Sequence, residues 1–142
     1  MTPFDYSVNL RVKHPSRHPD AIATDLAMSP RTAWNVGEPR VSASGRLLGG
    51  TRTETYCWFP MGDGHDGELA RCLSDALLEL ETRVNAVRAL KATGGTIQFY
   101  VFWYPNGDTG QVFDAALLSR MAALGIDLGI NVYDDRNAPE AN

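Results

Sequence analysis

The 142-residue chain has the length of one domain, and its 44% hydrophobic and 21% charged residues are typical of a globular protein rather than a disordered one. The formal net charge of −4 argues against general nucleic-acid binding, which depends on a surplus of lysine and arginine. The sequence contains no run of about 18 apolar residues, the length that a membrane helix needs.

These limits lead to expectations about organisation and location. We expect a single α+β domain over residues 1–136 and a frayed C-terminal tail over residues 137–142. Residues 1–13 alternate apolar with polar side chains and do not resemble a signal peptide, so we expect a cytoplasmic protein without membrane contact. In that compartment Cys57 and Cys72 are reduced, and we expect both to be buried and inert.

Alternation of apolar and polar residues predicts the first strand, over residues 4–13. Its apolar positions, separated by polar residues, are Phe4, Tyr6, Val8, Leu10 and Val12. A period of two places one set of side chains in a core and the other in solvent. The same alternation over residues 126–133 predicts a second one-sided strand near the end of the chain.

Three segments between these strands have helical periodicity: residues 19–26, 66–92 and 114–124. Pro19 suits the first position of the first helix. An apolar face runs without interruption through the second helix, which Asp66 can cap and Gly94 can end. Gly125 is expected to stop the third helix.

Two aromatic-rich strands complete the pattern, over residues 53–59 and 96–104, and the irregular stretch 30–52 is expected to hold one short strand near residues 41–48. One-sided terminal strands do not suit a parallel sheet that is covered on both faces. We therefore predict a two-layer α+β sandwich. It has a ferredoxin-like βαββαβ core with an appended helix and strand, a mostly antiparallel or mixed sheet, and its helices on one face.

Residues 62–67, Gly-Asp-Gly-His-Asp-Gly, match the G-x-G-x-x-G pattern of dinucleotide-binding proteins. Asp63 and Asp66 would, however, place carboxylates where a pyrophosphate must bind. The same segment contains hard metal ligands, but their spacing does not fit a calcium loop. We therefore expect no cofactor and no metal, and interpret the segment as an acidic entry to the following helix.

The sequence contains no recognised catalytic grouping, so we assign no catalytic residue and favour a binding protein over an enzyme. His14 and His18 flank prolines where the first strand meets the first helix. Either could act as a general base, but turn and capping roles fit them better.

The strand over residues 96–104 carries aromatic residues on both faces. One face holds Tyr100, Phe102 and Tyr104, and if this face is open its rings lie beside Arg11 and Lys13 of the first strand. Such a row could stack single-stranded bases, but the acidic composition makes nucleic acid a poor partner. We favour an interaction surface covered by the appended segment or by a second subunit, as in a homodimer. The sequence does not decide which face is exposed.

The stretch over residues 30–52 is rich in arginine and glycine, and its candidate ligand-binding residues are Arg31, Trp34, Arg40 and Arg52. Guanidinium groups bind carboxylates or phosphates, and an indole offers a stacking surface. These features predict a site for an anionic small molecule. The alternative, which we favour, is a structural loop that Trp34 pins to the core while its arginines remain in solvent.

The sequence also resembles a known family in several short motifs. They are Tyr6-Ser7-Val8-Asn9-Leu10-Arg11-Val12-Lys13-His14-Pro15, Pro30 with Trp34, Gly37-Glu38-Pro39-Arg40, Tyr56 with Trp58, Gly125-Ile126-Asp127-Leu128, and Val132-Tyr133. Together they resemble an uncharacterised bacterial family, domain of unknown function 4279. Cys57 stands where this family usually has a bulky residue. The resemblance implies no activity, cofactor or catalytic residue.

Three functions remain open, in order of preference. The first is a non-enzymatic protein-interaction or binding module with a protein partner, including an immunity- or inhibitor-type protein. The second is a small-molecule sensor that binds an anionic ligand through the Arg31–Arg52 loop. The third is an enzyme with an unrecognised site, which would require a pocket with a perturbed His14, His18 or carboxylate.

Overall fold

The computed structural model describes residues 2–133, so the predicted tail over residues 137–142 lies outside the described part of the chain. The elements in chain order are β1 (Asp5–His14), α1 (Pro19–Leu26), β2 (Thr32–Trp34), β3 (Pro39–Val41), β4 (Leu47–Thr51), β5 (Thr55–Gly64), α2 (Leu69–Glu81), α3 (Val84–Ala92), β6 (Thr96–Tyr104), α4 (Ala115–Ala123) and β7 (Ile126–Val132). Five of these strands form one sheet, and β3 and β4 form a separate hairpin.

The five-stranded sheet is centred on β1. Its strand order is β2-β5-β1-β6-β7, and β1 pairs antiparallel with both β5 and β6. The short strand β2 adds an antiparallel edge to β5, whereas β7 pairs parallel to β6 at the other edge. A parallel pair needs a crossover connection, which α4 supplies here.

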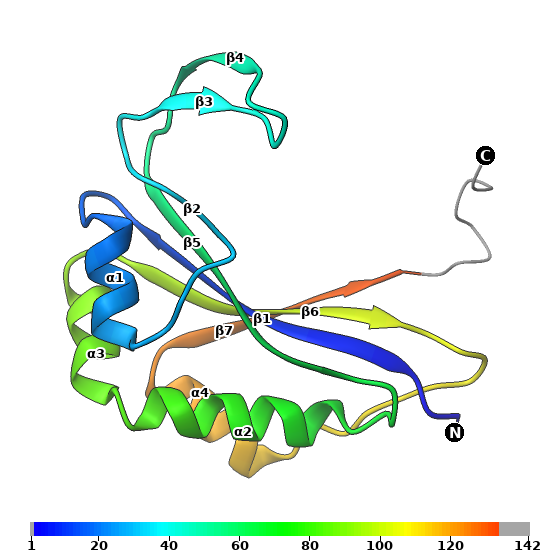
Figure 1. Cartoon of the computed structure of the whole chain (residues 1–142). Helices are drawn as coiled ribbons and strands as arrows, with labels where there is room; N and C mark the ends of the chain where they lie inside the picture. Colours follow the sequence, from blue (N-terminus) through cyan, green and yellow to red (C-terminus); the bar gives the residue numbers. More distant parts are fainter. Residues whose placement is uncertain (1, 134–142) are drawn as a thin grey trace, which may run out of the picture.

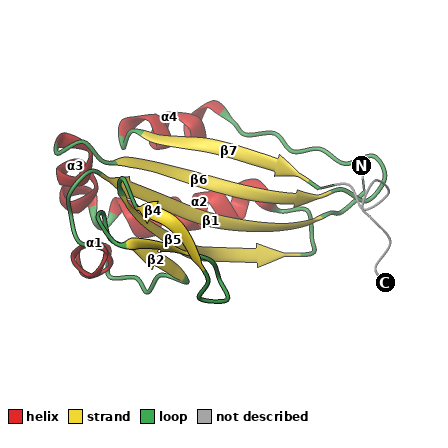
Figure 2. Cartoon of the chain, turned by 90° about the horizontal axis from the view of Figure 1, so that it is seen from above, coloured by secondary structure: helices red, strands yellow, loops and turns green. Residues whose placement is uncertain are grey.

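The four helices described lie on one side of the sheet. Figure 1 shows the helical layer along one side of the strands, and Figure 2 looks onto the opposite face with the helices behind it. The apolar side chains of β1 point toward the helices, and Val8, Leu10 and Val12 are completely buried. The β3–β4 hairpin projects from the other face, above the β2–β5 side of the sheet.

The structure confirms the predicted α+β class and the mostly antiparallel sheet. Its five-strand order differs from the sheet of a four-stranded ferredoxin-like domain, since β7 extends the sheet beyond β6. None of the helices within residues 2–133 is long and apolar enough to cross a membrane.

The prediction of one long helix over residues 66–92 is wrong, because α2 and α3 are separate helices that meet at Thr82 and Arg83. Arg83 leaves the helical conformation, with φ −117° and ψ 33°. The hydroxyl of Thr82 donates to the carbonyl of Glu79 at 2.6 Å and so competes for the acceptors of the last helical turn. The break turns α3 out of the line of α2, and Val87 of α3 is still completely buried.

The prediction of one short strand near residues 41–48 is also wrong. The chain instead forms two strands, β3 and β4, around a turn in which the amide of Gly45 donates to the carbonyl of Ser42 at 2.9 Å. Gly45 has φ +86°, a conformation that glycine adopts without strain. Every residue of β3 and β4 is exposed, so no hydrophobic periodicity marks these strands in the sequence.

The packing of α2 on the sheet gives a matched test of the core. Leu77 is completely buried, whereas its neighbour Leu78 is 59% exposed. Substituting Leu77→Ala is expected to lower the free energy of unfolding by about 2–5 kcal/mol, because it leaves a cavity between helix and sheet. Leu78→Ala is expected to change it by less than about 0.5 kcal/mol. Urea denaturation of both variants tests this arrangement, and equal losses would contradict it.

Candidate binding site on the open face of the sheet

The sheet face opposite the helices carries most of the aromatic and basic side chains that could bind a ligand, and we call it the open face. Directly paired residues of neighbouring strands share a face, so the register assigns its members: Ser7, Asn9, Arg11, Lys13, Trp34, Tyr56, Trp58, Gln98, Tyr100, Phe102 and Tyr104. No helix among residues 2–133 covers this face, which Figure 2 views directly. Its aromatic side chains are nevertheless half-buried by one another, except Tyr104, which is 37% exposed.

Three rings and one guanidinium form a cluster across β5, β1 and β6. Trp58, Tyr100 and Phe102 contact one another with ring centroids 5.4–6.0 Å apart. The guanidinium carbon of Arg11 lies 3.9 Å from the ring centre of Tyr100 and 5.7 Å from that of Trp58. These distances are those of cation–π contacts, so the rings hold the charge of Arg11 at the surface of the sheet.

A second stack lies beside the first, at the β2–β5 edge. The rings of Trp34 and Tyr56 stack with centroids 4.4 Å apart, and the guanidinium carbon of Arg52 lies 3.8 Å from the ring centre of Trp34. Arg52 also donates from its Nη2 to the carbonyl of Val41 at 3.0 Å, which ties the β3–β4 hairpin to the stack. The indole of Trp34 is therefore already in close contact with two planar groups of the protein.

Both stacked arginines keep an unused hydrogen-bond donor. The Nε atoms of Arg11 and Arg52 are buried and have no acceptor among the residues described. Lys13, on the same face, lies 3.8 Å from the carboxylate of Glu54, a long contact between two half-exposed side chains. The arrangement can therefore bind anionic groups, because it presents oriented guanidinium groups against rings that exclude water.

The structure brings the two predicted sets of residues together. Arg11, Lys13, Tyr100, Phe102 and Tyr104 were predicted as an interaction surface, and all five lie on the open face. Of the predicted ligand-binding residues, Trp34 belongs to the open face and Arg52 stacks on it.

The other two predicted residues, Arg31 and Arg40, lie next to the open face. Trp58 and Tyr56 lie on the open face itself. The amide of Arg31 donates to the carbonyl of Trp58 at 2.8 Å, and Arg40 lies on β3 of the hairpin. Neither Trp58 nor Tyr56 was among the predicted site residues. The signal for them was available in the alternation of the strand over residues 53–59, where both stand on the polar face.

The appended segment does not cover the aromatic strand as predicted. β7 lies beside β6 in the plane of the sheet and α4 lies on the helical side, so the open face remains open. Gly129 of β7 leaves room for the ring of Tyr100, since a Cβ there would lie 2.9 Å from that ring.

Two hollows indent the open face. The first, which we call the Asn9 hollow, has a volume of about 420 Å³ and is lined by Asn9, Arg31, Trp58, Asp63, Phe102 and Tyr104 among others. The second, the hairpin hollow, has a volume of about 400 Å³ and lies among Trp34, Arg40, Gly50, Arg52 and Glu54. Both volumes fall within the range of small-molecule sites, roughly 300–1,000 Å³.

A β-bulge brings Asp63 into the Asn9 hollow. Asn9 pairs with Pro60 and Val8 pairs with Gly62, so Met61 is an extra residue in β5. The extra residue reverses the alternation, and Asp63 then pairs with Ser7 on the open face.

The glycines of the G-x-G-x-x-G segment are explained by packing. A Cβ at Gly62 would lie 2.9 Å from the Sγ of Cys72, and one at Gly64 would overlap the ring of Tyr6. Asp66 was expected to cap α2, but its carboxylate instead accepts from the Tyr6 hydroxyl and from the amide of Glu68, both at 2.9 Å. Within residues 2–133 no three His, Cys, Asp or Glu side chains come together as a metal-binding group.

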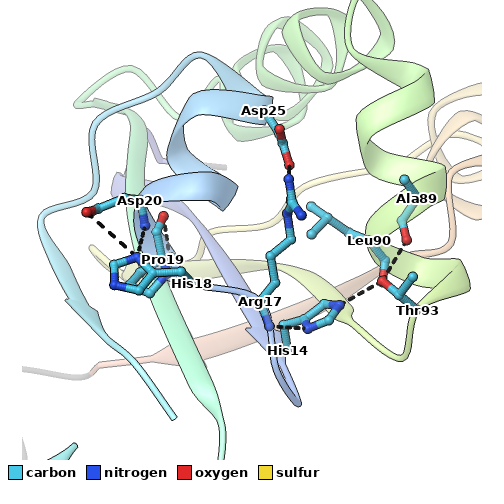
Figure 3. A network of polar contacts seen from close by, with 10 residues as sticks. His14, Arg17, His18, Pro19, Asp20, Asp25, Ala89, Leu90 and Thr93 are labelled. Atoms are coloured by element: carbon cyan, nitrogen blue, oxygen red, sulfur yellow. Dashed lines mark hydrogen bonds and ion pairs between the residues drawn. The ribbon is translucent and has the colours of Figure 1, made fainter.

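His14 is a structural residue that joins β1 to α3, as Figure 3 shows. Its Nδ1 accepts from the amides of Ser16 and Arg17, so the proton resides on Nε2, which lies 2.7 Å from the hydroxyl of Thr93. That hydroxyl donates in turn to the carbonyl of Ala89 at 2.8 Å. Burial lowers the pKa of His14 below the usual value of 6.5, with a further contribution from the charge of Arg17.

His18 and the two cysteines also have structural explanations. The side chain of His18 accepts from the amide of Asp20 at 3.1 Å and caps α1. Cys57 is completely buried, and burial raises its pKa to about 11, so it is a thiol at neutral pH. Cys72 is half-buried rather than buried as predicted, and burial raises its pKa as well.

Comparison with known proteins identifies a family without identifying an activity. A family model described as a domain of unknown function (DUF4279) matches residues 4–135. The chain therefore belongs to this family, as the resemblance of its sequence motifs predicted. No curated protein and no solved structure matches the chain.

The lowered pKa of His14 predicts a pH dependence of stability. Near pH 6.5 His14 takes up a proton in the unfolded chain but stays neutral in the folded chain. The contribution of neutral His14 to the free energy of unfolding is therefore fully present above that pH and decreases as the pH falls below it. We expect the urea midpoint of the wild type to fall more than that of His14→Gln between about pH 7.5 and about pH 5.5.

The titration of His65 affects the wild type and His14→Gln equally, so it cancels in this comparison. Its hydrogen bond with Asp5 raises its pKa, so its own contribution is lost as the pH rises, and it is the same in both proteins. Equal pH dependence of the wild type and His14→Gln would contradict the role of His14.

Proposed function

We propose that this chain is a non-enzymatic binding module whose open face binds an acidic segment of a protein partner. The observation that carries the proposal is the pair of arginines, Arg11 and Arg52, each held over an aromatic ring of the open face. Immunity- or inhibitor-type proteins are one class of such modules, and a second copy of this chain is an alternative partner.

The basic residues beside the two aromatic stacks support an anionic partner although the whole chain is acidic. Residues 1–60, which supply β1, β2, the hairpin and the first half of β5, contain seven basic and five acidic residues. Arg11, Arg52 and Lys13 lie on or against the face beside the two stacks, where Glu54 opposes them near Lys13. The acidic residues Asp5, Asp63 and Asp127 also lie on this face, so the positive charge is local to the stacks. Aromatic and arginine side chains are also the residues that contribute most at protein interfaces.

A capped hexaglutamate peptide is a direct probe of this proposal. We expect it to change the tryptophan fluorescence in a saturable way, and we expect rising salt to weaken the binding. The double variant Arg11→Met/Arg52→Met is expected to lose at least about tenfold in affinity, since each guanidinium contributes charge-assisted hydrogen bonds.

A matched control removes two arginines from the helical side. Arg71 of α2 and Arg88 of α3 are exposed, so Arg71→Met/Arg88→Met changes the net charge equally and is expected to keep the affinity. Equal weakening in both double variants, or no response of the wild type, would refute the open face as an acid-binding surface. Thermal unfolding of each variant establishes that it is folded.

The hairpin hollow favours a second candidate function, the sensing of an anionic small molecule. Arg40 and Arg52 converge there, and the Cδ of Arg40 lies 3.9 Å from the Cβ position of Gly50. Thr51 and Thr53 add hydroxyl groups, while Glu54 limits the net positive charge.

Thermal-shift measurements with phosphorylated metabolites and dicarboxylates test this second function. We expect at least one of them to stabilise the wild type and to stabilise Arg40→Ala several-fold less. Because Arg40 is exposed, the substitution alone is expected to change stability by less than about 0.5 kcal/mol. Equal stabilisation of the variant, or none of the wild type, would remove the hairpin hollow as the site.

Two finer proposals concern fold and location. We propose that β1-α1-β2 and β5-α2-α3-β6 are the two interleaved βαβ units of one ferredoxin-like fold. In this interpretation α4 and β7 are additions to that fold. The antiparallel order β2-β5-β1-β6 within the sheet supports this proposal.

We also propose a cytoplasmic location, where the thiols of Cys57 and Cys72 remain reduced.

A further inference from the structure

We infer that the Asn9 hollow is a binding site for a free α-amino acid with an aromatic side chain. Its carboxylate would bind Arg31, its ammonium group would bind Asp63, and its side chain would lie against Trp58, Phe102 and Tyr104. This site does not rest on the proposed acidic partner, since neither Arg11 nor Arg52 lines the hollow.

The hollow is lined by a buried polar side chain whose hydrogen bonds are long. Asn9 is only 4% exposed, yet it lies on the open face and lines the hollow. Its amide nitrogen is 3.4 Å from both the Ser7 hydroxyl and the Tyr100 carbonyl, longer than good hydrogen bonds of about 2.7–3.2 Å. A buried amide with such long contacts gains from a polar group in the hollow.

The two charged residues of the hollow form no ion pair within the described part of the chain. Neither Arg31 nor Asp63 has an ion-pair partner within 4.0 Å among residues 2–133. Both residues line the same hollow, one of each sign. A simple anion would be repelled by Asp63 and a simple cation by Arg31, so a ligand that carries both charges suits the pair.

The register places the two charged residues at different levels of the sheet. Arg31 lies beside Trp58, which pairs with Arg11, and Asp63 pairs with Ser7. Four residues along β1 separate these two levels by roughly 13 Å. A ligand that binds both residues must therefore lie along β1 between these two levels.

The walls of the hollow select the side chain of the ligand. Trp58 and Phe102 are half-buried, and Tyr104 is 37% exposed, so all three offer ring surface that a bound group can cover. Aromatic rings prefer offset or edge-to-face contacts with other rings, worth about 0.5–1.5 kcal/mol beyond burial. The bulge at Met61 connects these features, because it turns Asp63 toward the rings.

Titration calorimetry with four ligands tests the inference on the intact chain. We expect L-phenylalanine to bind, and we expect 3-phenylpropionate, phenethylamine and glycine each to bind at least about tenfold more weakly. The first analogue lacks the ammonium group, the second lacks the carboxylate and the third lacks the ring.

Two variants separate the charged contacts. Asp63→Asn is expected to weaken L-phenylalanine about tenfold but not to weaken 3-phenylpropionate, because the substitution removes the repulsion between Asp63 and its carboxylate. Arg31→Met is expected to weaken L-phenylalanine similarly but not to weaken phenethylamine, because the substitution removes the repulsion between Arg31 and its ammonium group. Matched controls are Asp127→Asn, an exposed aspartate of β7 on the same face, and Arg46→Met, an exposed arginine in the hairpin turn.

Three results would overturn the inference. They are a wild type that does not bind L-phenylalanine at millimolar concentration, a control variant that weakens binding as much as Asp63→Asn, and equal weakening of all ligands by Asp63→Asn. The result is independent of the hexaglutamate experiment, because Arg11→Met/Arg52→Met leaves Arg31 and Asp63 in place.

Discussion

The register of β1 between β5 and β6 is the constraint on which the rest of the structure depends. Within this one strand Val8 and Leu10 are completely buried under the helices, while Asn9 and Arg11 lie on the open face. A shift of one residue would bring the polar side chains into the core and Val12 to the surface. Because β1 has antiparallel partners on both sides, such a shift would also break both ladders. The core therefore determines which side chains the open face presents.

The stacked arginines contribute little to the stability of the fold. Cation–π contacts such as that of Arg11 on Tyr100 contribute about 0.5–2 kcal/mol. A buried donor without an acceptor, such as the Nε of Arg11 or Arg52, costs about 1–3 kcal/mol. These opposing contributions are of similar size, so the stacked arginines add little net stability.

The sequence predicts the strands with a polar face better than it predicts the irregular part of the chain. Alternation is sufficient for β1, which contrasts a buried face with a polar one, and it also marks β7, although only Ile126 of that strand is buried. The break between α2 and α3 escaped prediction because the apolar face continues across Thr82. Sequence patterns predict the aromatic row of residues 96–104 and the arginine-rich stretch of residues 30–52 as two separate candidate sites. Their proximity depends on strand pairing, and the position of Asp63 depends on the bulge at Met61, neither of which a hydrophobic period encodes.

The path of the appended segment explains why the aromatic strand stays accessible. A parallel β6–β7 pair requires a crossover, and α4 makes that crossover on the side where the other helices already lie. β7 must then join the sheet at its edge and cannot fold over the rings of β6. Gly129 lets the Tyr100 ring spread over β7, because a Cβ there would lie 2.9 Å from that ring. The extension thus widens the open face, and a group that covers its half-buried rings must come from outside residues 2–133.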